Sequence, residues 1–317
     1  MSRGAEPLPP GPTLRNLRSP GGYVLTFDVE EWFHTCMVPE YVDPARRPPL
    51  RRELDRLLPE ILELLASAGR TATFFVLGEV AAEVPARVRE IESAGHEVAS
   101  HSYRHFRMGA RPLDEFRADV VRSKALLEDL VGRAVTGYRA PEWSLRRFDN
   151  PRLEILAELG FRYDSSLAPF PGAGSRRNPD RAAVLSWGPG RSLLELPPLA
   201  LWRRWRVPGN GWPARLLPAS WIARAAKAHR EEKGLSVLVA HPWELTPSDT
   251  PGDLTGLARQ IHEVGRATYR PRFEQVLSAL PWTSARTALD AAPAVVSVEE
   301  GVPAAALALE PSPRGRA

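Results

Sequence analysis

Short apolar segments alternate along the middle of the chain with longer segments in which apolar residues recur at helical spacing. The apolar segments predict strands over residues 23–27, 71–77, 96–100, 137–139, 161–163, 193–196 and 235–240. The helical spacing predicts helices over residues 54–68, 84–94, 113–131 and 151–159, and a glycine follows each of them. Strands that alternate with helices indicate βαβ units and an α/β fold with a parallel sheet.

The number of predicted strands bears on the architecture. About seven strands over roughly 220 residues favour an incomplete α/β barrel, and a doubly wound open sheet is the alternative. In both architectures ligands bind at the carboxyl ends of the strands. Ionisable or metal-binding side chains follow five of the predicted strands: Asp28, Glu30, Glu31, His101, His105, Arg139, Asp164 and His241. We therefore predict an active site at this end of the sheet.

The two ends of the chain differ from its middle part. Prolines and small residues dominate residues 1–20 and 286–317, and we expect disordered tails there, with one domain over residues 21–285. The chain of 317 residues is 43% hydrophobic and 25% charged, as in globular proteins. No apolar run approaches the roughly 18 residues of a membrane-spanning helix, and no export signal is visible, so a cytoplasmic location is expected.

The cysteine content and the charge of the chain exclude further classes of protein. The single cysteine, Cys36, leaves no internal disulfide and no cysteine-built zinc site, and we expect it to be a small buried apolar residue. The formal net charge is +4, and only three of the 42 cationic residues are lysines. This arginine bias is typical of a GC-rich genome, so we predict no nucleic-acid partner.

A histidine pair points to metal chemistry. His101 and His105 are four residues apart, so both imidazoles can face one metal ion if the loop turns into helix. Two histidines need a third ligand, usually a carboxylate, and Asp28, Glu30 and Glu31 are the candidates.

Five segments resemble, in order, the motifs of the polysaccharide deacetylases, carbohydrate esterase family 4 with its NodB-type homology domain. They are LTFDVEEWFH (25–34), SHSYRH (100–105), YRAPEWS (138–144), YDSSL (163–167) and LVAHPWE (238–244). The first and last most resemble the exopolysaccharide-locus branch found with PEP-CTERM/exosortase systems, with residues 200–280 as a branch-specific part. The resemblance implies a distorted (β/α)7 barrel and a divalent metal ion, often zinc. It also implies removal of N-acetyl groups from a polysaccharide or oligosaccharide.

The resemblance also implies roles for single residues. Asp28 is similar to the family's general base and Arg139 to the arginine that holds it. His101 and His105 are similar to its metal-binding histidines, and His241 to its general acid. Asp164 lies in the motif whose carboxylate orients that histidine, and a backbone N–H after Arg139 would stabilise the oxyanion.

The first motif departs from the family pattern. Where the family has a second, metal-binding aspartate, this chain has Val29, which cannot bind a metal. Residues two apart on a strand share a face, so Glu30 is our predicted third ligand and Asp28 the alternative.

Four aromatic or imidazole side chains are candidates for binding the substrate: Trp143, Tyr138, His34 and Trp243. For His34, packing in the core is an equal alternative. We expect His96, His229 and His262 to be surface or core residues. The segment LALWRRWR (199–206) is interpreted either as a surface that binds polysaccharide or anionic lipid, or as a helix with its tryptophans packed inward.

The predicted function is metal-dependent N-deacetylation of a bacterial exopolysaccharide or cell-surface polysaccharide that contains N-acetylhexosamine. One alternative is a related hydrolase that acts on a small amide or ureide. Another is a non-catalytic carbohydrate-binding or assembly protein without the metal site, which Val29 keeps open. A cytoplasmic enzyme would meet a growing glycan at the inner face of the membrane, so a peripheral association there is also expected.

Overall fold

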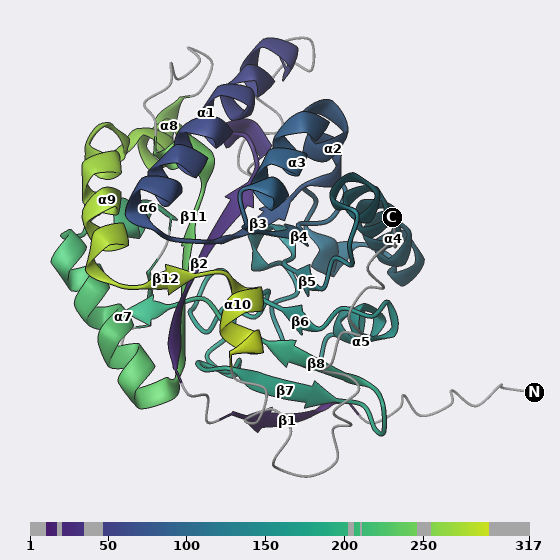
Figure 1. The fold of residues 1–317 in the computed structure, drawn as a ribbon. Helices are drawn as coiled ribbons and strands as arrows, with labels where there is room; N and C mark the ends of the chain where they lie inside the picture. Colours follow the sequence, from purple (N-terminus) through teal and green to yellow (C-terminus); the bar gives the residue numbers. More distant parts are fainter. Residues whose placement is uncertain are drawn as a thin grey trace, which may run out of the picture.

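A run of parallel strands forms the centre of the fold, with helices packed around it (Figure 1). The computed structural model describes residues 11–17, 21–34, 47–201, 206–209, 211–245 and 255–291. Within these residues seven parallel strands follow one another in the order β8, β6, β5, β4, β3, β2 and β11. Their bounds are β2 Gly22–Val29, β3 Thr73–Val76, β4 Glu97–Ser100, β5 Gly137–Tyr138, β6 Tyr163–Asp164, β8 Ser192–Glu195 and β11 Leu235–Ala240.

The two ends of this run meet at one point. No hydrogen-bonded ladder between β8 and β11 is present among the described residues. A single parallel bridge pairs Pro198, just after β8, with Val237 of β11, and Leu199 N–H donates to the Val237 carbonyl at 2.8 Å. The predicted α/β class is therefore confirmed, and the sheet curls into a ring whose last junction is one bridge.

Helices lie between and around the strands. The larger ones are α1 Arg47–Ala68, α3 Pro85–Ser93, α4 Leu113–Val131, α7 Ala219–Lys233 and α9 Tyr269–Ala279. Shorter helices are α2 Gly78–Glu83, α5 Pro151–Glu158, α6 Gly211–Leu216, α8 Gly256–Glu263 and α10 Ala285–Asp290. The predicted helix over 113–131 has the observed bounds, because Gly132 ends it in the left-handed conformation (φ 68°) that glycine adopts without strain.

Additional strands extend one edge of the sheet. Strand β7 Ala183–Ser186 pairs antiparallel with β8, and β1 Thr13–Asn16 pairs antiparallel with β7. Two other pairings do not lie at this edge. A short strand β12 Trp282–Thr283 pairs with β2, and β9 Ala200–Leu201 with β10 Val207–Pro208 forms a separate two-stranded sheet.

Parts of both expected tails are structured. The expectation of a disordered segment over 1–20 is wrong for residues 13–16, because β7 offers these residues a free strand edge and Leu17 is buried beside it. At the other end α10 runs past residue 285 to Asp290. Residues 1–10, 18–20 and 292–317 lie outside the described residues.

Alternate residues of the strands face two different environments. Tyr23, Leu25, Phe27 and Val29 of β2 belong to the large apolar cluster that includes the buried faces of α1, α4 and α9. Val24 belongs to a second cluster, which among the helices includes only α10 residues. One set of side chains therefore packs against the surrounding helices, and the other set fills the interior of the ring.

Candidate active site

A cavity of about 480 Å³ opens at the carboxyl ends of the parallel strands. Seven of the eleven predicted site residues line it: Asp28, Glu30, His101, His105, Trp143, His241 and Trp243. Arg139 lies directly behind Asp28. The remaining wall includes Arg107, Glu142, Arg146, Arg215 and His262, which the sequence analysis does not predict as site residues.

Glu30, His101 and His105 form a cluster whose ligand atoms all lie within 4.8 Å of one another. Glu30 Oε2 is 2.5 Å from His105 Nε2 and 3.8 Å from His101 Nε2. His101 Nδ1 donates to the Arg139 carbonyl at 2.8 Å, which leaves the Nε2 lone pair directed at the cluster. One carboxylate and two imidazoles that converge in this way are a donor set suited to zinc or a similar divalent ion.

The position of Glu30 follows from the alternation of β2. Val29 points into the helix-packed core and is fully buried, whereas Asp28 and the following Glu30 face the cavity. Burial by itself raises the pKa of Glu30, but the charge of His105 and hydrogen bonds from His101 and His105 outweigh burial and hold that pKa well below its usual range. The carboxyl group is therefore ionised and available as a ligand.

The loop that carries the two histidines is fixed by Asp119 of α4, a residue that the sequence analysis does not identify. Its carboxylate accepts hydrogen bonds from the backbone N–H groups of Tyr103 (2.7 Å) and Arg104 (3.2 Å). Ser102 in the same loop has a positive φ of 69°, a strained conformation for a residue other than glycine. Burial raises the pKa of Asp119 to about 6.

Asp28 and Arg139 form a buried ion pair at the base of the cavity. Arg139 Nη1 lies 2.6 Å from Asp28 Oδ1 and 2.9 Å from Thr26 Oγ1, and its other side-chain nitrogens donate to Ser165. The guanidinium is completely buried and lies 4.1 Å from the centre of the Phe75 ring. These contacts hold the Asp28 carboxylate in one orientation and balance its charge.

His241 approaches the same carboxylates from β11. Its Nε2 is 3.8 Å from Asp28 Oδ2 and 3.7 Å from Glu30 Oε1. Its Nδ1 donates to Glu244 Oε2 at 2.9 Å. Burial by itself lowers the pKa of the imidazolium, but the negative charge and hydrogen bond of Glu244, with the charges of Glu30 and Asp28, raise the pKa of His241 to about 9.

Glu244 is the residue that orients His241, and the sequence analysis does not predict it. It ends the short 3-10 helix Pro242–Glu244, so its carboxylate folds back onto the His241 ring and onto the His241 backbone N–H. On its other side Arg215 Nε of α6 lies 3.3 Å from Glu244 Oε1. Burial alone raises the pKa of Glu244, yet the charge of His241 and the other cationic contacts lower it overall.

Asp164 does not contact His241, and its predicted role is wrong for a geometric reason. Asp164 pairs in register with Tyr138, and both belong to the strand faces that point away from the ring interior. Its carboxylate accepts from Ser166 Oγ at 2.5 Å and hydrogen-bonds to Glu195 of β8. Burial raises the pKa of both carboxyl groups of this pair.

Two of the predicted substrate-binding residues are core residues. Tyr138 is fully buried against the rings of Phe116 and Phe161, and its hydroxyl hydrogen-bonds to Ser102 Oγ at 2.7 Å. His34 is buried, accepts a hydrogen bond from Glu31 N–H at Nδ1 and faces Glu79 through Nε2 (3.2 Å). The alternative of a packed histidine is thus the observed one for His34.

The predicted oxyanion donor is also engaged elsewhere. The backbone N–H after Arg139 belongs to Ala140 and donates to Ser166 Oγ at 2.8 Å. Ser166 in turn is held by Asp164, so this amide is part of the scaffold behind the cavity.

The two predicted tryptophans do line the cavity. Trp143 packs edge-on against Phe170, with 6.0 Å between ring centres. Trp243 stacks on His262 at 5.1 Å with an interplanar angle of 17°. His262, expected to be a surface or core residue, therefore forms part of the wall. Burial lowers its pKa to about 3, and the Arg266 guanidinium donates a hydrogen bond to its Nε2.

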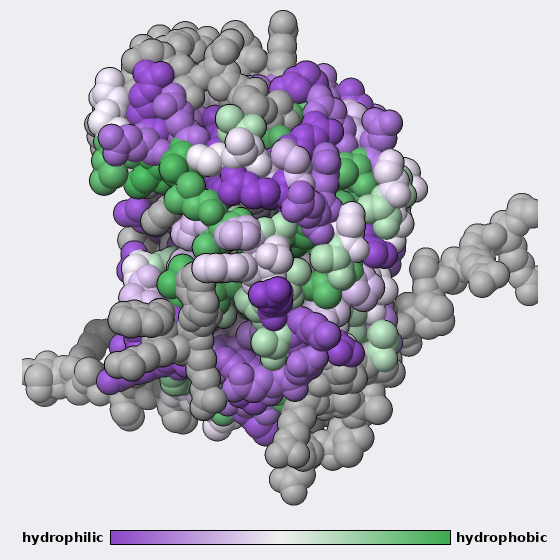
Figure 2. Space-filling view, turned by 90° about the vertical axis from the view of Figure 1, so that its left-hand side faces the viewer, coloured by the Kyte–Doolittle hydropathy of each residue, from purple (hydrophilic) through white to green (hydrophobic). Residues whose placement is uncertain are grey.

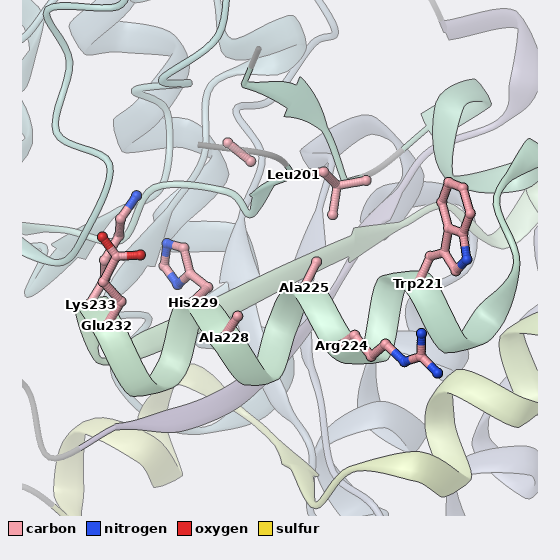
Figure 3. A pocket seen from close by; sticks show the side chains of 9 residues that line it. Leu201, Trp221, Arg224, Ala225, Ala228, His229, Glu232 and Lys233 are labelled. Carbon is pink, nitrogen blue, oxygen red and sulfur yellow. The ribbon is translucent and has the colours of Figure 1, made fainter. Parts of the chain in front are cut away.

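A second cavity, of about 440 Å³, lies along α7 and shares no residue with the first. Figure 3 shows Trp221, Arg224, Ala225, Ala228 and His229 along one side of the helix, with Leu201 opposite. On this side of the molecule hydrophobic and hydrophilic residues are intermixed (Figure 2). Residues 202–205 of the predicted glycan- or lipid-binding segment, and Cys36, lie outside the described residues.

Within the described residues, no helix combines the length and apolar composition needed to cross a bilayer.

Two family models match consecutive parts of the chain. Residues 23–163 match the polysaccharide deacetylase family, and residues 165–290 match a domain of unknown function, DUF3473. The boundary falls at β6, within the run of parallel strands. Both matched segments therefore contribute strands to one ring.

Three curated relatives are similar to part of the chain. A Helicobacter pylori peptidoglycan deacetylase is 36% identical over 35% of this chain and 36% of its own length. A Bacillus cereus peptidoglycan-N-acetylglucosamine deacetylase is 35% identical over 26% of this chain and 30% of its own. An Azorhizobium caulinodans chitooligosaccharide deacetylase is 29% identical over 33% of this chain and 49% of its own. The chain thus spans half or less of each relative.

A solved structure from Mycobacterium smegmatis, assigned by name to the polysaccharide deacetylases, has a similar fold. The TM-score is 0.54 at 23% identity, and the superposition covers 88% of this chain and 91% of that one. The similarity extends over both matched segments.

Proposed function

We propose that the protein is a metal-dependent N-deacetylase, on the basis of the match of residues 23–163 to the polysaccharide deacetylase family. Its proposed substrate is a bacterial exopolysaccharide or cell-surface polysaccharide that contains N-acetylhexosamine. The names of the relatives support the N-acetylated glycan, since they include peptidoglycan, N-acetylglucosamine and chitooligosaccharide. The exopolysaccharide is supported by the resemblance of residues 25–34 and 238–244 to the exopolysaccharide-locus branch.

One observation carries the proposal. The cluster of Glu30, His101 and His105 lies in the same cavity as the Asp28–Arg139 ion pair and the His241–Glu244 pair. Hydrolysis of an amide needs a base for the attacking water and an acid for the leaving amine. The cavity holds a candidate of each kind beside the candidate metal ligands, Asp28 on β2 and His241 after the neighbouring strand β11.

Glu30, His101 and His105 would hold the metal ion. A divalent ion bound there would polarise the acetyl carbonyl and lower the pKa of water, which are the two contributions that amide hydrolysis needs from a metal. The second nitrogen of His101 is fixed by the Arg139 carbonyl, so this ring is oriented before the ion binds. Zinc is the proposed ion because histidine and carboxylate ligands suit it.

Asp28 is the proposed general base. It takes a proton from the attacking water, and Arg139 holds its carboxylate in the orientation that this transfer requires. The backing of Arg139 by Thr26 and Ser165 keeps this geometry fixed while the charge on Asp28 changes.

His241 is the proposed general acid. The leaving amine departs only after it gains a proton, and an imidazolium with a pKa of about 9 carries that proton at neutral pH. Glu244 accepts a hydrogen bond from Nδ1, so the proton at Nε2 points to the side where Asp28 and Glu30 lie.

Trp143 and Trp243 are the proposed substrate-binding residues. Both indole rings line the cavity, and the flat face of Trp143 is suited to pack against the C–H face of a sugar ring. Trp243 is packed between His262 and two arginines, Arg215 and Arg266, so its contribution is a fixed apolar part of the wall.

Acetate release from N-acetylglucosamine oligomers tests the proposal. We expect release by the wild-type protein and a rate lower by about 10³-fold in Asp28→Asn, within the range for removal of a general base. Asp55→Asn is the matched control, because this exposed aspartate of α1 pairs with Arg87 at 2.7 Å and lines neither the active-site cavity nor its neighbour. Equal release by wild type and Asp28→Asn contradicts the assignment of the base. No release from any N-acetylated glycan, with binding retained, would favour the non-catalytic alternative.

The location at the inner face of the membrane also belongs to the proposal. The proposed substrate supports this location, because an enzyme that acts on a lipid-linked or growing glycan must reach it at that surface. Fractionation of cells into membrane and soluble material tests it, and recovery in the soluble material alone at low salt contradicts it.

A further inference from the structure

The active-site cavity continues into a neighbouring groove. A third cavity, of about 500 Å³, lies next to it and shares two residues with it, Arg107 and Arg146. Its remaining walls are formed by residues of two neighbouring loops and the start of α5: Gly109, Ser144, Leu145, Arg147, Asp149, Asn150 and Pro151. A polymeric substrate whose acetylated unit occupies the active-site cavity has a path past these two arginines into the third cavity.

Arg146 differs from the other arginines that line these two cavities. Arg107 pairs with Glu142 at 3.1 Å, Arg147 with Asp149, and Arg215 with Glu244. In the described part of the chain, the exposed Arg146 guanidinium has no such carboxylate partner. Its positive charge is therefore available to a ligand at the boundary between the two cavities.

The backbone holds Arg146 in place at this boundary. Glu142, Trp143 and Arg146 have positive φ angles of 54°, 49° and 57°, which residues other than glycine rarely adopt. The side-chain amide of the buried Asn178 donates to the Arg146 carbonyl at 2.9 Å and to the Ala168 carbonyl at 3.0 Å. Such strain persists only where the surroundings maintain it, and it is concentrated at ligand-binding sites.

Charge is distributed unevenly along the path. In the inner cavity Asp28 is paired with Arg139, and Glu244 is paired with His241 and Arg215, so these cations are already balanced and a neutral acetamido sugar is accepted there. At the boundary Arg146 offers a planar guanidinium, which pairs with a carboxylate through two parallel hydrogen bonds.

We propose that Arg146, flanked by Arg107, forms a subsite for a carboxylate-bearing sugar next to the unit that is deacetylated. The inference rests on the proposed function and names its substrate class, an acidic polysaccharide in which uronate units accompany N-acetylhexosamine units. Arg107 contributes less to the subsite because its charge is already balanced by Glu142.

The test compares two tetrasaccharides, a neutral one of N-acetylglucosamine and an acidic one that alternates N-acetylglucosamine with glucuronate. For the wild-type protein we expect a KM about five- to tenfold lower for the acidic chain, and a smaller difference at high salt. Arg146→Gln should remove the difference while KM for the neutral chain stays the same, and Arg146→Lys should restore part of it. Arg133→Gln is the matched control, because its exposed guanidinium is paired with Glu92 at 2.8 Å and lines neither of the two cavities.

Calorimetric binding of both tetrasaccharides separates this inference from the proposed function. If the acidic chain is bound more tightly through Arg146 but no acetate is released, the subsite is supported and the deacetylase proposal fails. If both chains are deacetylated with the same KM, or if Arg146→Gln raises both KM values equally, the subsite is overturned and the proposed function stands.

Discussion

The segments 23–163 and 165–290 contribute to one cavity in different ways. The first supplies the candidate metal ligands, the Asp28–Arg139 pair and Trp143 from the ends of consecutive parallel strands. The second, matched to a domain of unknown function, supplies His241, Glu244 and Arg215 from β11, a 3-10 helix and α6. The comparison shows that this second segment completes the ring of strands and, in our proposal, provides the proton donor.

The two segments also differ in how their site residues are positioned. His101 is held by the Arg139 carbonyl from the adjacent strand β5, and the Arg139 side chain reaches across the ring to Asp28 on β2. His241 depends on a carboxylate three residues later and, through it, on an arginine from a separate helix. The metal cluster thus depends on the order of the strands and on Asp119 of α4, and the proton donor depends on a carboxylate and an arginine of its own segment.

The largest expected effect tests the contribution of the first segment. Glu30→Ala removes one of three ligands, so we expect metal affinity to fall about 100-fold or more and activity with it. Metal content after dialysis measures the affinity. Asp28→Asn is the paired variant, because it should lose activity and keep its metal. If Asp28→Asn loses the metal and Glu30→Ala retains it, the ligand assignment is reversed.

The next effect tests the second segment. Glu244→Gln removes the charge that most raises the pKa of His241, so we expect kcat to fall about 10- to 100-fold. Because the acid acts only while protonated, the rate falls as pH rises through this pKa. The alkaline limb of the pH–rate profile should therefore move to lower pH by about one unit or more.

Asp164→Asn is the control for Glu244→Gln. Asp164 lies on the opposite face of the sheet, so the alkaline limb of the pH–rate profile of Asp164→Asn should match that of the wild type. A profile that shifts in Asp164→Asn and not in Glu244→Gln would restore the prediction made from the sequence.

A smaller effect concerns the junction of the two segments. A Cβ added at Gly137 of β5 would lie 2.2 Å from the Tyr163 hydroxyl of β6, so Gly137→Ala should lower the free energy of unfolding by about 1–3 kcal/mol. Urea denaturation measures it. Gly11→Ala is the matched control, since its nearest atom is 3.9 Å away. Equal stability of the two variants would show that β5 and β6 accommodate the added methyl group without a loss of unfolding free energy.

The smallest expected effect concerns Tyr138, which is predicted from the sequence to bind the substrate and is a core residue in the structure. Tyr138→Phe deletes the hydroxyl that bonds Ser102, so we expect a loss of about 1 kcal/mol in unfolding free energy. KM for the oligosaccharide should not change, since the ring faces α4. A raised KM with unchanged stability would return Tyr138 to the site.

Much of the fold could be predicted from the sequence because its strands are short apolar segments bounded by turns. The strand over 235–240 and the helix over 113–131 match their observed bounds. Strand β1 was not predicted, because its partner β7 is distant in sequence. Strands β9 and β10 were not predicted, because two residues each are too few to show a periodic pattern.

The candidate site could be predicted where the alternation of side chains between the two faces of a strand was taken into account, and the prediction failed where it was not. Val29 and Glu30 were assigned to opposite faces, as observed. Tyr138 and Arg139 were both placed in the site, although neighbours on a strand face opposite sides. Glu244 was present in the HPWE segment, and its spacing from His241 is the signal that could have identified it. Arg215 and His262 give no local signal, because tertiary packing alone brings them to the cavity.

The single bridge between Pro198 and Val237 gives the ring a mechanical weak line. Along β2 and β11 six registered pairs share any load, whereas at the bridge one amide carries it. A pull across the ring therefore opens it at this bridge or between β4 and β5, where Ser100 and Tyr138 form the one registered pair. Strands β11, β2, β3 and β4 remain joined, and they carry His241, Asp28, Glu30 and the two histidines at their ends. Tension on the molecule would thus leave the proton donor and the metal ligands on one connected group of strands.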